Sequence, residues 1–159
     1  MSPVHAWRPR VLGPLLLCLL LVIATGCDAI STTPPAPTPA DFQGIASELT
    51  RRGVVIDDIV SGDAGCDDEV LTPTAIALTT SGLDQATPVR LYLYIFRNRE
   101  VFERLRATID GCARSYVTDP QTFESIEQSP FVVTAQGPWA PEFEAAVRES
   151  LEVAAGTGN

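Results

Sequence analysis

The apolar residues of the chain follow a helical period first and a strand period next. Residues 40–53 show the helical period, and Gly53 is a residue type that commonly ends a helix. The apolar face of this predicted helix consists of Phe42, Ile45, Ala46 and Leu49. Residues 54–60 and 74–80 are short and rich in β-branched side chains, so each predicts a strand.

Residues 89–96 alternate strictly and predict a third strand. One face carries Val89, Leu91, Leu93 and Ile95, and the other carries Arg90, Tyr92, Tyr94 and Phe96. We expect the aliphatic face in the core and the aromatic face half covered. The period then becomes helical over residues 98–117, with Asn98 as the N-cap. The apolar stripe of this helix is Phe102, Leu105, Ile109, Cys112 and Tyr116.

The last part of the domain predicts a strand followed by a helix. Residues 118–128 are expected to be a connector with at most one helical turn, and residues 130–137 to be a strand. Residues 140–156 predict a helix that starts at Pro141 and turns Phe143, Val147, Leu151 and Ala154 inward. The order α-β-β-β-α-β-α predicts an α+β two-layer sandwich. Its sheet would be mainly antiparallel, with about four strands and with helices on one face.

The first 27 residues have the pattern of an export signal. Arg8 and Arg10 precede an apolar run at residues 11–24, which is shorter than the ~20 residues that a membrane-spanning helix needs. The sequence ATGC at residues 24–27 resembles the lipobox of bacterial lipoproteins. This resemblance implies cleavage before Cys27 and attachment of a diacylglycerol to the Cys27 thiol.

The resemblance implies three segments: a signal peptide at residues 1–26, a lipidated Cys27 with a Pro/Thr-rich tether at residues 27–40, and one domain at residues 41–156. The mature protein is then expected to sit on a bacterial cell membrane, held by acyl chains such as palmitate and facing away from the cytoplasm. An ordinary cleaved signal peptide and an uncleaved anchor are the alternatives. The resemblance says nothing about the domain.

Two of the four cysteines are left for a disulfide under this interpretation. Cys18 leaves with the signal peptide and Cys27 takes the lipid, so Cys66 and Cys112 are predicted to pair. A redox role would favour a C-x-x-C spacing, which these two residues do not have.

Composition excludes several function classes for the mature chain. All 11 basic residues are arginine, and two of them leave with residues 1–26, so nine remain against 20 carboxylates. The only histidine, His5, leaves as well, which argues against a histidine-dependent triad or a His-ligated metal. The absence of lysine excludes Schiff-base chemistry, and the acidic balance argues against nucleic acid as a partner. No cofactor is predicted.

The densest acidic stretch, residues 57–69, raises the question of calcium. Glycines and several carboxylates in one loop suit a hard cation, although the spacing does not match an EF-hand. The candidate ligands are Asp63, Asp67, Asp68 and Glu69. The alternative is a solvated turn in which Asp and Gly supply the turn geometry.

Two further kinds of site are considered. Paired carboxylates can act as acid and base on a glycoside, but no particular pair stands out among 20. Trp139 lies in a Gly-Pro turn and is the candidate ligand-binding aromatic, whereas Tyr92, Tyr94 and Phe96 are expected in the core. The leading hypothesis is a non-enzymatic binding module with a protein, cell-wall or small-molecule partner. A carboxylate-dependent hydrolase of envelope polysaccharide and a calcium-stabilised structural module are the alternatives.

Overall fold

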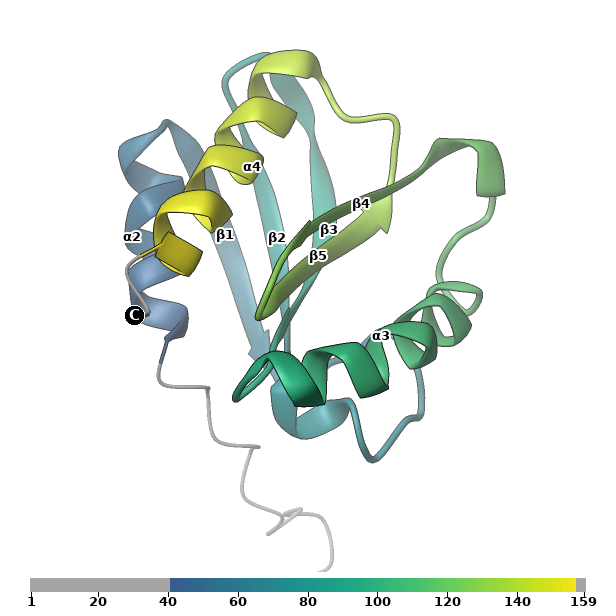
Figure 1. Cartoon of the computed structure of the whole chain (residues 1–159). Coiled ribbons are helices and arrows are strands. Elements are labelled where there is room, and N and C mark those ends of the chain that lie inside the picture. Colours follow the sequence, from purple (N-terminus) through teal and green to yellow (C-terminus); the bar gives the residue numbers. More distant parts are fainter. Residues whose placement is uncertain (1–40, 157–159) are drawn as a thin grey trace, which may run out of the picture. The chain divides into compact units, whose positions relative to one another are not determined.

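A five-stranded antiparallel sheet organises residues 41–156, the part of the chain that the computed structural model describes (Figure 1). The strands are β1 (Val54–Ser61), β2 (Ala75–Gly82), β3 (Gln85–Ile95), β4 (Phe123–Gln128) and β5 (Phe131–Gln136), arranged in the order β1-β2-β3-β5-β4. The helices are α2 (Phe42–Arg51), α3 (Arg99–Ala113) and α4 (Pro141–Gly156). The predicted α+β class is confirmed, and the predicted order of helices and strands holds with one additional strand, β4.

Helices α2 and α4 cover one face of the sheet. Leu91 and Leu93 of β3 belong to the same buried cluster as Leu49 of α2 and Phe143 of α4. The apolar stripes predicted for these two helices therefore face the core. Burial there is favourable because it removes a large apolar area from water. Helix α2 ends where expected, with Gly53 at a φ of +91°.

Helix α3 packs on the opposite face, so helices do not lie on one face only as the sequence suggested. Tyr94 and Phe96 are almost completely buried, and they share a cluster with Ile109 and Cys112 of α3. Both faces of β3 are thus apolar at this end, and the aromatic face needs a cover of its own. The predicted N-cap is present, since the Asn98 side chain accepts a hydrogen bond from the Val101 amide at 3.0 Å.

The fifth strand, β4, lies in the segment expected to be a connector. Its residues Phe123–Gln128 pair with β5, after a short 3-10 turn at Pro120–Thr122. Only Ile126 of β4 is buried, because β4 is an edge strand with two glutamates. A strand with one buried apolar residue shows almost no alternation of apolar and polar residues in its sequence. The extended conformation of β4 therefore depends on its pairing with β5 and not on local sequence.

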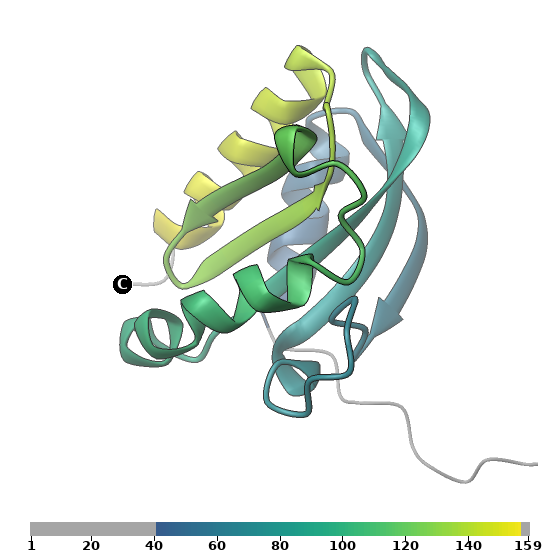
Figure 2. The ribbon, with the colours of Figure 1, turned by 90° about the vertical axis from the view of Figure 1, so that its right-hand side faces the viewer.

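Helix α3 covers only part of its face of the sheet (Figure 2). Helix α3 lies across one end of the sheet, and the other end of β2 and β3 extends beyond it (Figure 2). Within residues 41–156, no helix is long and apolar enough to cross a membrane.

Candidate binding face

The candidate site is the part of the α3 face that the helix leaves open. Strand β3 contributes Arg90 and Tyr92, strand β5 contributes Thr134 and Gln136, and the segment after α3 contributes Tyr116. We call these five residues the tyrosine face. They come together because Tyr92 lies opposite Thr134 in the ladder between β3 and β5.

Tyr92 and Tyr116 stack on each other at the centre of the tyrosine face. Their ring centroids are 4.2 Å apart and the ring planes are inclined by 31°. The Tyr116 hydroxyl and the Oγ1 hydroxyl of Thr134 form a 2.6 Å hydrogen bond. Thr134 is fully buried. Burial raises the pKa of both tyrosines, because removal from water disfavours the phenolate, and the nearby Asp63 carboxylate raises that of Tyr92 further.

The acidic loop, residues 62–69, borders the tyrosine face and is fixed in place by three contacts. Tyr94 donates a hydrogen bond from its hydroxyl to the carbonyl of Ala64 at 2.8 Å. Gly65, with a φ of +74°, lies so close to the tyrosine pair that a Cβ there would be 2.5 Å from Cδ1 of Tyr116. The predicted disulfide between Cys66 and Cys112 is present, with Cα atoms 5.4 Å apart, and it joins the loop to α3.

Arg90 joins the acidic loop to the sheet. Its guanidinium donates to Asp63 Oδ2 at 2.9 Å and to Asp58 Oδ2 at 3.0 Å, and it also reaches Oγ1 of Thr79 at 3.0 Å. Partial burial on its own lowers the pKa of Arg90, but hydrogen bonds to the two carboxylates outweigh it and the pKa is raised. The Arg90 charge is therefore used inside the protein and is not available to an anionic ligand.

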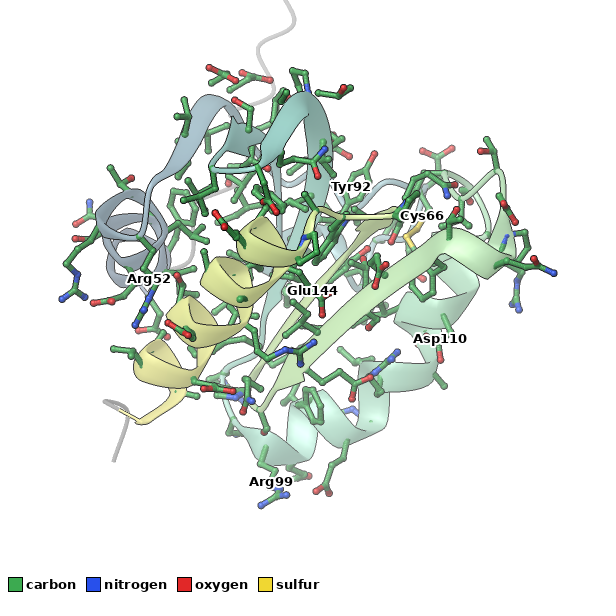
Figure 3. The ribbon with its side chains drawn as sticks, turned by 90° about the horizontal axis from the view of Figure 1, so that it is seen from above. Arg52, Cys66, Tyr92, Arg99, Asp110 and Glu144 are labelled. Carbon is green, nitrogen blue, oxygen red and sulfur yellow. A yellow bond between two sulfur atoms is a disulfide. The ribbon has the colours of Figure 1, made fainter. Side chains whose placement is uncertain are left out.

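Two open depressions border Tyr92 of the tyrosine pair. The larger, of about 860 Å³, is formed by the acidic loop together with Tyr92 and Ser115. The smaller, of about 480 Å³, is lined by Tyr92, Tyr116, Gln136 and the prolines Pro88 and Pro138. Tyr92 thus borders both depressions, and Figure 3 shows it close to Cys66 of the acidic loop. The arrangement presents aromatic edges and polar groups to a molecule that lies across the sheet.

The four carboxylates considered for calcium lie in one loop, but they do not converge on a common point where a cation could bind. Asp63 accepts from the Gly65 amide and from Arg90, and one oxygen of Asp68 accepts from the amides of Val70 and Leu71. These hydrogen bonds are the turn-forming role that was the alternative to calcium. Among residues 41–156, no group of three or more His, Cys, Asp or Glu side chains is placed to hold a metal ion.

Trp139, the candidate ligand-binding aromatic, is buried in the core and does not face solvent. Its side chain is 5 % exposed and packs edge-to-face against Phe143, with ring centroids 6.1 Å apart. The turn carries the indole under the start of α4, where burial of its large apolar ring stabilises the fold. The sequence did not single out Tyr116 as a site residue, because its spacing placed it in the apolar stripe of the predicted helix at residues 98–117. The helix in fact ends at Ala113, and the Tyr116 ring stacks on Tyr92.

Cys27, the predicted lipidation site, lies outside the described residues. Comparison with known proteins adds no assignment, since no family model matches the chain and no curated protein or solved structure resembles it significantly.

Proposed function

We propose that this protein is a lipid-anchored binding module that faces away from the cytoplasm on a bacterial membrane. The lipobox-like ATGC at residues 24–27 supports an anchor on Cys27, and the Pro/Thr-rich residues 28–40 suit a tether. The disulfide between Cys66 and Cys112 agrees with an oxidising compartment. The ligand in this proposal is a component of the cell envelope, bound on the tyrosine face.

The observation that carries the binding role is the half-buried tyrosine pair, of which Tyr92 lines two open depressions. Arg90, Asp63, Gly65 and the disulfide hold this region in shape, so a ligand meets a preformed surface. Preformed sites cost less conformational entropy on binding. Stacked tyrosines offer both apolar ring area and hydroxyl groups, a combination that suits sugars and peptides.

The binding module takes precedence over the two alternatives. A hydrolase needs a carboxylic acid that is free to protonate its substrate, whereas Asp63 and Asp68 in the large depression already accept hydrogen bonds from Arg90 and from the Leu71 amide. A calcium module needs converging oxygen ligands, and within residues 41–156 no such set is preformed.

The anchor is tested by replacing Cys27. Cells that produce the full chain are extracted with detergent, and the membrane fraction and protein mass are compared between wild type and Cys27→Ala. We expect the wild type to carry acyl chains and to partition into detergent, and the variant to retain its signal peptide without acylation. An unchanged mass in the variant would contradict the anchor. The matched control is Cys18→Ala, which removes a thiol from the same apolar run.

The tyrosine face is tested with soluble peptidoglycan fragments as the probe. We expect backbone amide signals of β3 and of the acidic loop to shift in nuclear magnetic resonance titrations of the full chain. Tyr92→Leu should weaken the effect by about tenfold, which corresponds to the ~1.4 kcal/mol of one aromatic contact. Val153→Ala, a change of an exposed side chain on α4, is the control. Shifts that are absent or confined to other surfaces would refute this part of the proposal.

A further inference from the structure

Strand β1 is an edge strand with exposed apolar side chains. Its only neighbour in the sheet is β2, and no described segment pairs with its outer side (Figure 1). Val55 and Ile59 are each 49 % exposed and Val60 is 38 % exposed, and only three other large apolar side chains are as open among residues 41–156. An outer row of free backbone groups beside exposed aliphatic residues is a template for an added strand.

The exposed side chains lie on both sides of the sheet. Ile59 lies opposite Leu78, so both side chains point to the face of the sheet that α2 and α4 cover. Val60 lies opposite Ala77, on the side of α3. A strand added to β1 therefore finds apolar contacts above and below the sheet plane, as a central strand does.

Two carboxylates divide this apolar edge. Asp58 is paired with Arg90 at 3.0 Å. Asp57, at the irregularity in the β1–β2 ladder, has only a 3.5 Å contact from the Ser81 hydroxyl and no ion pair within the described part of the chain. The Asp57 carboxylate thus leaves a negative charge on the edge without a cationic partner.

We propose that β1 is a docking edge for an extended segment of a partner protein that carries a cationic side chain opposite Asp57. The partner strand pairs with the free backbone groups of β1, its aliphatic side chains cover Val55, Ile59 and Val60, and its cation pairs with Asp57. This is recognition by strand addition, in which backbone pairing supplies affinity and side chains supply specificity. The edge meets the tyrosine face only through the ion pair between Asp58 and Arg90, and this inference does not rest on the proposed function.

A second copy of the chain is a poorer occupant than a basic strand. The sequence VIDDIV at residues 55–60 reads the same in both directions, so a twofold antiparallel pair would place Asp57 opposite Asp58 of the other copy. Like charges directly opposite each other destabilise strand pairs, and irregularities on edge strands oppose indiscriminate pairing. A cationic residue of the partner strand opposite Asp57 would be attracted to its carboxylate, where Asp58 of a second copy is repelled.

The test uses a synthetic peptide of alternating valine and arginine, titrated into the isotope-labelled full chain. We expect chemical-shift changes in β1 and slower hydrogen exchange of its amides. A second peptide has the same side chains but N-methyl groups on alternate backbone nitrogens, so it keeps the charge and loses strand pairing. We expect this peptide to produce no protection of β1. Equal binding by both peptides would show simple charge attraction and overturn the proposal.

Two charge reversals complete the test. Asp57→Lys should weaken binding of the unmethylated peptide by about tenfold, because attraction becomes repulsion. Glu100→Lys makes the same change of net charge at an exposed position on α3 and should weaken binding less than about twofold. Equal effects of the two variants would overturn the proposal. So would self-association of the wild type through β1 in the absence of peptide, seen as concentration-dependent shifts of β1 amides.

Discussion

The Asp84 carboxylate caps the amino terminus of a helix that begins far along the chain. Its Oδ1 accepts a hydrogen bond from the Phe143 amide at 2.9 Å, across a sequence separation of 59. Its Oδ2 accepts from the Glu142 amide at 3.0 Å, and the neighbouring Gln85 side chain accepts from the Ala140 amide at 2.9 Å. The turn between β2 and β3 thus supplies the acceptors that the first turn of α4 lacks, and it joins α4 to the sheet.

Asp84→Ala should destabilise the domain by about 1–2 kcal/mol, because it leaves two amides of α4 without an acceptor and removes a favourable charge at the helix terminus. The free energy of unfolding in urea is the measurement. Asp41→Ala is the matched control, since Asp41 precedes α2 but makes no capping hydrogen bond with its side chain. We expect the control to change stability by less than about 0.5 kcal/mol. Equal losses in the two variants would contradict the capping role of Asp84.

Gly65→Ala should loosen the acidic loop and cost about 1–3 kcal/mol. The new Cβ would meet Cδ1 of Tyr116 at 2.5 Å and Cε1 of Tyr92 at 2.9 Å, in a backbone conformation that alanine disfavours. Gly44→Ala is a control for which we expect a change of stability in the opposite direction, because nothing lies within 4 Å of the new Cβ and the residue is helical, in the first turn of α2. We expect Gly44→Ala to stabilise the domain by about 0.5–1 kcal/mol. Thermal unfolding of both variants would show the contrast.

Removal of the disulfide should lower stability by about 2–4 kcal/mol. Cys66 and Cys112 are separated by 46 residues, so their bond removes many conformations from the unfolded chain. The Cys66→Ala and Cys112→Ala double variant and the reduced wild type should unfold at similar urea concentrations. The oxidised protein should unfold at a higher one. A double variant as stable as the oxidised wild type would show that the bond contributes nothing to the fold.

Stability should fall with alkaline pH because of the three tyrosines. Burial raises the pKa of Tyr92, Tyr94 and Tyr116 above the ordinary 10.0, so the folded protein holds phenol protons that the unfolded chain releases. Their contribution is complete below pH 10.0 and is lost as pH rises through the folded pKa values. The chain has no other tyrosine and no lysine, so tyrosinate absorbance reports these groups directly. Ionisation near pH 10.0 with the domain still folded would contradict this prediction.

The sequence by itself determined the elements that carry a strong local signal. The alternation at residues 89–96 and the helical stripes that begin at Phe42 and Phe143 each required a buried face, so the fold class and the order of these elements followed from period alone. The resemblance of residues 24–27 to a lipobox left Cys66 and Cys112 as the predicted pair, and the structure contains a bond between them. These inferences need only local periodicity and residue identity.

The tertiary structure alone decided how these elements share the two faces of the sheet. Strand β4 exists because β5 offers it a ladder, and α3 covers the second face because Tyr94 and Phe96 must be buried there. Trp139 is buried under α4, whereas Tyr116 stacks on Tyr92 beyond the end of α3. Burial depends on contacts between residues distant in sequence, and local patterns do not contain that information. The tyrosine face and the open edge of β1 are both consequences of this packing.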